Sequence, residues 1–206
     1  KGNQQGDVVE VYFKDPQIND AGLVHLREFP KLKVIALNSK KKIGDEGLYH
    51  LIGLANLEEI NLAGTQVTDA GLVHLKGMTK MKYLFLSGTQ ITDAGLVHLA
   101  KLPNIRRLFL YGTGVTDKGL PHLKGLVSLE TLCLDETRVS DEGLSNIRGL
   151  MALEVLHLRS RLPVSDRSIP LIIRFEKLRE LKVEGTKITP EGLERLKRKL
   201  PDCRIE

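Results

Sequence analysis

Residues 57–78 read LEEINLAGTQVTDAGLVHLKGM, and this stretch is one complete unit of a pattern that fills the chain. Similar phrases follow at 88–101 (GTQITDAGLVHLAK) and from Gly112 (GTGVTDKGLPHLKG). A phrase that recurs at a fixed period indicates a repeat architecture, and here the period is 24 residues in most units and 25 in the others. The units begin at Val8, Leu32, Leu57, Met81, Ile105, Leu129, Leu153 and Leu178, with a truncated ninth at Cys203.

Each unit changes its side-chain period half-way. In LEEINLA, residues alternate as in a strand, so Ile60 and Leu62 are predicted to face a core. Leu72, Leu75 and Met78 then recur at three-residue steps, which places them on one stripe of a helix. A unit of this size cannot bury its apolar side alone, so successive units must stack, with strands forming a parallel sheet and helices the opposite wall.

Between strand and helix stands a column of residue types that begin helices. Its members are Asn19, Gly44, Thr68, Thr92, Thr116, Ser140, Ser165 and Thr189. Seven Asp residues and Pro190 follow directly, and acidic residues and proline both suit a helix start. Pro121 and Pro170 lie too deep for such a helix, so in these two units we expect a later start.

The unit L-x-x-L-x-L-x-G-T-x-[VI]-T-D-x-G-L-x-H-L-x-x-L resembles the leucine-rich repeat over nearly the whole chain. It is most similar to the ribonuclease-inhibitor-like and F-box-protein subtypes, whose units continue from the strand into a [IV]-T-D-x-G-L helix. Thr replaces the usual Asn or Cys after the strand, a variant that resembles repeats common in bacterial proteins. The resemblance implies an α/β fold, a right-handed horseshoe solenoid of about 8 repeats with its parallel sheet on the concave face and helices on the convex face.

For the domain organisation we expect a short, truncated lead at 1–7 and a single leucine-rich-repeat domain at 8–206. The charged helix after about residue 190 is expected to cap the C-terminal end. The segment KGNQQGD is too short to cover Val9, Val11 and Phe13, so a cap or further repeats are expected before Lys1.

The composition of the chain limits the classes of partner that it is expected to bind. No apolar run approaches the ~18 residues of a membrane span, and the chain shows no signal sequence, which leaves its compartment open. The net charge of +5 is small and mixed along the chain, a poor basis for binding nucleic acid. Cys133 and Cys203 should lie three strands, or about 14 Å, apart, which predicts two free thiols.

The concave positions of the strands depart most from the repeat. Of the nine aromatic residues, five are predicted to point out of the sheet there, and four of these form one cluster: Tyr83, Phe85, Phe109 and Tyr111. Arg107, Asp135, His157 and Arg159 border the cluster. Exposed aromatic residues beside arginine are typical of protein-protein hot spots, although the rings could also simply cover one another.

Cys133 and His157 share a concave column on neighbouring strands, with Asp135 diagonal to them. Such a trio could activate a thiolate or hold a metal. Because an open sheet offers no oxyanion donors and no water-excluding pocket, we interpret it as variation within a binding surface. We therefore predict no catalytic residue, no metal and no cofactor. GTGVTD from Gly112 also fails as a dinucleotide loop, since Asp117 replaces its last glycine.

Two further features stay secondary. Histidines 25, 50, 74, 98 and 122 repeat at one helix slot, which favours packing over a metal site. Two units lose the Gly-Thr turn, so their loops could extend the binding face; the candidates are Lys40, Lys41, Lys42, Arg161 and Leu162.

The sequence thus predicts a recognition module for a protein or peptide, without catalysis. Phe85, Phe109 and Tyr111 would anchor the ligand, while Arg107, Asp135, His157 and Arg159 would orient it. The alternatives are a structural spacer within a larger polypeptide and, from another class, an enzyme dependent on Cys133 and His157. The identity of the partner and the oligomeric state stay open.

Overall fold

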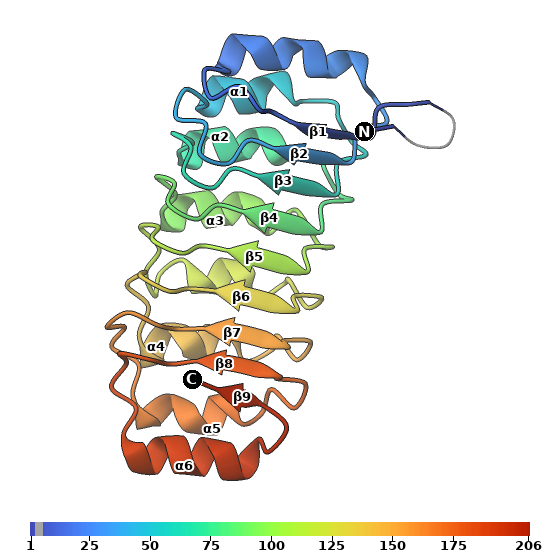
Figure 1. The fold of residues 1–206 in the computed structure, drawn as a ribbon. Coiled ribbons are helices and arrows are strands. Elements are labelled where there is room, and N and C mark those ends of the chain that lie inside the picture. Colours follow the sequence, from blue (N-terminus) through green and yellow to red (C-terminus); the bar gives the residue numbers. More distant parts are fainter. Residues whose placement is uncertain (3–5) are drawn as a thin grey trace.

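The computed structural model describes residues 1–2 and 6–206, which form one open parallel sheet with helices stacked on one of its faces (Figure 1). The sheet has nine strands whose spatial order follows the chain from β1 to β9. The predicted leucine-rich-repeat horseshoe is confirmed, including the truncated ninth unit. The strands are β1 (Glu10–Tyr12), β2 (Val34–Ala36), β3 (Glu59–Asn61), β4 (Tyr83–Phe85), β5 (Arg107–Phe109), β6 (Thr131–Cys133), β7 (Val155–His157), β8 (Glu180–Lys182) and β9 (Arg204–Ile205).

The strands pair without any shift in register, so equivalent residues of successive units lie side by side. Tyr83 pairs with Arg107, for example, and Phe85 pairs with Phe109. The central residue of each strand from β2 to β8 points to the helices and is fully buried, as Leu84 and Leu108 are. The first and third residues therefore point out of the concave face, where they are free to differ between units.

Short helical turns form the other layer. They are η1 (Asp20–Glu28), α1 (Asp45–His50), α2 (Asp69–Leu72), η2 (Val73–Leu75), α3 (Asp93–Leu99), η3 (Leu120–Leu123), α4 (Asp141–Leu144), η4 (Ser145–Ile147), η5 (Asp166–Ser168), α5 (Ile169–Ile172) and α6 (Pro190–Lys199). The later start predicted from Pro121 is confirmed, because this proline lies in the first turn of η3. In the unit of Pro170 the turn η5 begins at Asp166, without delay, and Pro170 lies in the first turn of α5, which follows it. Among the described residues, no helix has the length and apolar character needed to cross a membrane.

The predicted capping column acts as expected. Asn19, Thr68, Thr92, Thr116, Ser140, Ser165 and Thr189 each accept a backbone N–H from the turn that they begin. Gly44 has no side chain to offer.

The Asp column has a role that the sequence did not reveal. Asp45 accepts hydrogen bonds from the backbone N–H and the hydroxyl of Thr68 in the next unit, at 2.8 and 2.7 Å. The same pair of bonds joins Asp93 to Thr116 and Asp166 to Thr189. Each aspartate therefore ties its own unit to the next, in addition to lying at a helix start.

These aspartates also explain the glycine of the D-x-G-L slot. A Cβ added to Gly47 would meet Asp20 Oδ1 at 2.5 Å, and one added to Gly119 would meet Asp93 Oδ1 at 2.5 Å. A side chain in this slot would displace the carboxylate that joins the two units.

The two ends differ from the middle. At the N-terminal end, Gly2 pairs with Val8 in an antiparallel bridge and Val9 donates to the Lys1 carbonyl at 2.9 Å, while residues 3–5 of the predicted lead lie outside the described residues. Val11 and Phe13 pack against the core but stay partly exposed. At the other end α6 packs with Leu196 buried, and β9 then pairs with β8.

The repeated histidines, His25, His50, His74, His98 and His122, lie in the helical layer. His50 and His74 both contact the ring of Tyr49 edge-on, with centroids 5.8 and 5.6 Å apart, whereas His25 is exposed beside Glu28. These contacts are made to a tyrosine rather than from one imidazole to the next.

Candidate functional site

The centre of the concave face is a pair of stacked rings. Phe85 on β4 and Phe109 on β5 lie parallel, with centroids 4.7 Å apart and an interplanar angle of 8°. Both rings stand on the side of the sheet away from the helices and are partly exposed. Their edges and outer surface are therefore available to another molecule.

A second contact joins the same two strands one step earlier. The guanidinium of Arg107 lies 5.5 Å from the centroid of the Tyr83 ring, within the range of a cation–π interaction. Arg107 is exposed, and Tyr83 is partly exposed. The predicted cluster thus consists of four neighbouring aromatic side chains and one arginine. Ring stacking and the unshifted pairing of β4 with β5 hold them together. We call Tyr83, Phe85, Arg107, Phe109 and Tyr111 the aromatic patch.

Tyr111 is the most exposed of the four aromatic residues in this patch, with 40% of its surface accessible. A hydrogen bond to the Glu136 carboxylate raises the pKa of the Tyr111 hydroxyl. The Glu136 carboxylate thus lies near the patch, on the turn after β6.

Glu136 itself occupies an unusual backbone conformation. In four sister turns the equivalent position is Gly64, Gly88, Gly112 or Gly185, with φ between 62° and 77°, and in two others it is Ser39 or Ser160. Glu136 has φ of 55°, a left-handed conformation that costs a non-glycine residue about 1 kcal/mol or more. Sequence reasoning missed Glu136, although the replacement of glycine in that column was a visible signal.

Asp135 requires a correction. It was predicted to orient a ligand from the concave face, but its carboxylate is buried, with 1% of the residue exposed. Arg159 donates to it from the backbone N–H at 2.6 Å, from Nε at 3.1 Å and from Nη2 at 3.0 Å. Asp135 therefore orients Arg159, and the same contacts raise the pKa of that guanidinium.

His157 is likewise held within the sheet. Its Nε2 lies 2.9 Å from Glu180 Oε1, and Lys182 Nζ lies 3.0 Å from the same oxygen. The hydrogen bonds from Lys182 and His157 lower the pKa of Glu180. This network spans β7 and β8 and leaves the His157 side chain 15% exposed.

Cys133 does not have the properties of an activated nucleophile. Burial raises the pKa of its thiol to about 12, with a smaller contribution from the neighbouring Asp135 carboxylate. At neutral pH the sulfur is protonated, which removes support from the alternative of a Cys133-dependent enzyme. Both cysteines are free thiols, as predicted.

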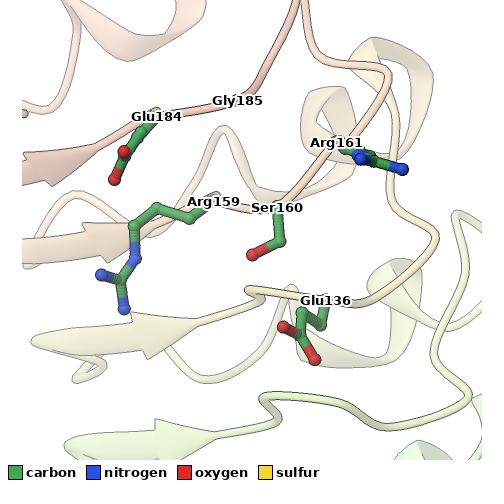
Figure 2. Close-up of a pocket in the computed structure, with 6 residues that line it drawn as sticks. All are labelled: Glu136, Arg159, Ser160, Arg161, Glu184 and Gly185. Atoms are coloured by element: carbon green, nitrogen blue, oxygen red, sulfur yellow. The ribbon is translucent and has the colours of Figure 1, made fainter.

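A cavity of about 570 Å³ lies next to the patch, at the ends of β6 to β8 (Figure 2). Its lining residues are Glu136, Arg159, Ser160, Arg161, Glu184 and Gly185. Ser160 and Arg161 have φ of 77° and 62°, so this loop places two more non-glycine residues in the left-handed region. Arg161 points away from Glu184 in Figure 2. The prediction that Leu162 extends the binding face is wrong, because this residue is buried in the core.

The comparisons with known proteins agree with this architecture. The family model described as "Leucine Rich repeat" matches residues 53–75, 77–100 and 176–197. No curated protein sequence matches the chain. The chain therefore carries leucine-rich repeats, as its sequence predicts.

Three similar solved structures come from bacteria. The crystal structure of internalin C2 from Listeria monocytogenes is 26% identical, with a TM-score of 0.70, and the match covers 91% of this chain and 73% of that one. The internalin InlF from the same species is 20% identical, with a TM-score of 0.72, covering 96% of this chain and 60% of that one. A leucine-rich-repeat protein from Leptospira interrogans is 17% identical, with a TM-score of 0.52, covering 89% and 62%. The last two likenesses concern the fold alone.

Proposed function

We propose that this leucine-rich-repeat protein is a recognition module that binds a protein or peptide through the aromatic patch. The observation that carries the proposal is the stacked pair of Phe85 and Phe109, which stands on the solvent side of the sheet. Core packing does not require rings at these positions, because the sister strands carry Ala36 and Asn61 there.

The chemistry of the patch suits a polypeptide ligand. An apolar or aromatic side chain would pack on the stacked rings, which bury a large area with few rotatable bonds to order. Arg107, exposed beside Tyr83, offers a cation to a carboxylate of the ligand. The ion pairs of Arg159 with Asp135 and of Lys182 with Glu180 leave little excess charge nearby, which disfavours a polyanion.

The site residues have different roles in this proposal. Phe85, Phe109 and Tyr111 anchor the ligand, while Arg107 and Arg159 orient it. Asp135 and His157 act through their partners Arg159 and Glu180 rather than by direct contact. The cavity bounded by Glu136 and Glu184 would extend the surface for a longer ligand.

A double variant tests the proposal. Proteins captured from a lysate of the source organism are compared by quantitative mass spectrometry for the wild type and for Phe109→Ala/Tyr111→Ala. Tyr49→Ala is the matched control, because this exposed tyrosine lies on α1 in the helical layer. We expect a partner retained by the wild type and by Tyr49→Ala to be lost by the double variant.

Equal capture by all three proteins would contradict the proposal and favour the structural spacer.

The repeat pattern with its [IV]-T-D-x-G-L helix supports a ribonuclease-inhibitor-like or F-box-like subtype of the repeat.

A further inference from the structure

A second group of side chains lies beside the aromatic patch, on β6 and β7. Cys133, Asp135 and His157 each bring one sulfur, oxygen or nitrogen atom within 4.8 Å of the other two. Cys133 and His157 are register partners on adjacent strands, and Asp135 follows two residues after Cys133 on the same face. Cys133 is 5% exposed and Asp135 1%, so two of the three groups are shielded from bulk water.

The repeat does not require this group. In the sister units the position of Cys133 and His157 is occupied by Ala36, Asn61, Phe85 and Phe109. The position of Asp135 is Lys14, Asn38, Ala63, Ser87 or Tyr111 in the units before it. Three buried or half-buried groups with metal-binding chemistry therefore coincide at one place where stacking accepts other residues.

Surrounding residues orient two of the three groups. Arg159 holds Asp135 through three donors, and the Glu180 carboxylate accepts from His157 Nε2 at 2.9 Å. A histidine that binds a metal commonly gives its other ring nitrogen to a carboxylate, which fixes the ring and its tautomer. With Nε2 at Glu180, Nδ1 is the nitrogen left to bind an ion.

The spacing of the group suits a small tetrahedral ion. Zinc bonds of ~2.3 Å to sulfur and ~2.1 Å to oxygen place neighbouring ligand atoms about 3.5 Å apart. Cys133 Sγ and Asp135 Oδ2 are already 3.6 Å apart. The His157 ring nitrogen lies within 4.8 Å of both of these atoms, so a side-chain rotation is what would bring it to bonding distance.

We propose that Cys133, Asp135 and His157 bind a zinc ion. Thiolate, carboxylate and imidazole are the ligand set that zinc uses in proteins, and three such ligands leave a fourth position for water. The thiolate and carboxylate balance the two charges of the ion, and Glu180 balances the neighbouring Lys182. Binding forms the zinc–sulfur bond and breaks the Cys133 S–H bond, so one proton passes to solvent for each ion.

Cobalt(II) provides the test, because it occupies zinc sites and absorbs strongly when a thiolate binds it. Metal-free protein is titrated with Co²⁺ alone, and the thiolate-to-cobalt charge-transfer band is recorded in the near ultraviolet. Cys203→Ser is the matched control, since it removes the other free thiol, and circular dichroism checks that each variant folds.

We expect a saturable band at one Co²⁺ per chain in the wild type and in Cys203→Ser, reversed by Zn²⁺. The band should disappear in Cys133→Ser, and His157→Gln should weaken Co²⁺ binding at least tenfold, as loss of a ligand does. Absence of the band in the wild type, its survival in Cys133→Ser, or unchanged affinity in His157→Gln would each overturn the proposal. Calorimetry with Zn²⁺ in two buffers measures the released proton independently of any variant.

Discussion

Asp141 accepts hydrogen bonds from both the backbone N–H and the hydroxyl of Ser165, one repeat later, at 2.9 and 2.6 Å. A third bond arrives from the Ser168 hydroxyl at 2.5 Å. Burial alone would raise the pKa of Asp141, but these hydrogen bonds outweigh burial and lower it. One carboxylate thus joins two successive units on the side of the helical layer, in addition to the backbone hydrogen bonds between β6 and β7.

Asp141→Asn should destabilise the protein by ~1–3 kcal/mol at neutral pH, because hydrogen bonds to a charged acceptor are lost. The folded-state pKa of Asp141 is depressed, so its contribution is present above the unfolded-state pKa and is lost as the pH falls through the folded-state pKa. Urea unfolding at pH 7 and in acid measures both effects, and the variant should lose less stability in acid than the wild type.

Asp20→Asn is the control for the hydrogen bonds that Asp141 accepts from hydroxyl groups. Asp20 accepts from the Gly44 backbone N–H at 2.8 Å, and Gly44 has no hydroxyl to donate. A smaller loss, about 1 kcal/mol, is expected there. Equal losses at Asp20 and Asp141 would show that the hydroxyl bonds add nothing.

The glycine slot gives a second prediction. Gly119→Ala should destabilise by about 1–3 kcal/mol, because the new methyl would lie 2.5 Å from Asp93 Oδ1 and 2.9 Å from Leu96 Cδ1. Gly125→Ala should be neutral or stabilise by about 0.4–1 kcal/mol, since nothing lies within 4 Å of its added Cβ. Thermal unfolding of both variants checks the contrast, and similar melting temperatures would rule out the steric account.

Glu136→Gly should raise stability by about 1 kcal/mol and weaken partner capture. The left-handed backbone at Glu136 suits glycine, as it does in Gly112 with φ of 62°. Removal of the carboxylate also frees the Tyr111 side chain. Chemical denaturation and the capture assay are the two measurements, and Gly112→Ala, which should lose about as much stability, is the reciprocal control. If Glu136→Gly is more stable and still captures the partner as well as the wild type does, the glutamate has no part in binding.

The two thiols should differ in reactivity. With a metal chelator present, a thiol reagent at pH 8 should modify Cys203 well before Cys133, because Cys133 is 5% exposed and Cys203 is partly exposed. Burial raises the pKa of both thiols, to about 12 for Cys133. In denaturant the two rates should become equal. Faster modification of Cys133 in the folded protein would restore the case for a catalytic cysteine.

The candidate site was predictable to different degrees along the concave face. Phe85 and Phe109 were placed correctly from strand alternation, because equivalent positions of adjacent strands must lie side by side in a parallel sheet. Asp135 was placed on the right strand end but given the wrong role, because its burial depends on Arg159 in the next unit. Glu136 was missed: the loss of glycine from its column is visible in the sequence, but the left-handed backbone that Glu136 keeps there is known only from the structure.

The sequence by itself determined the repeat, the order of the strands, the buried leucine rows and the positions where helices start. These features follow from residues within one unit and its neighbour, and a repeated pattern reports them many times over. The tertiary structure decided which carboxylates face solvent, which join units and which surround Cys133. Those choices rest on contacts between side chains about one repeat apart, such as Asp135 with Arg159, and their geometry depends on how the units pack rather than on any local pattern.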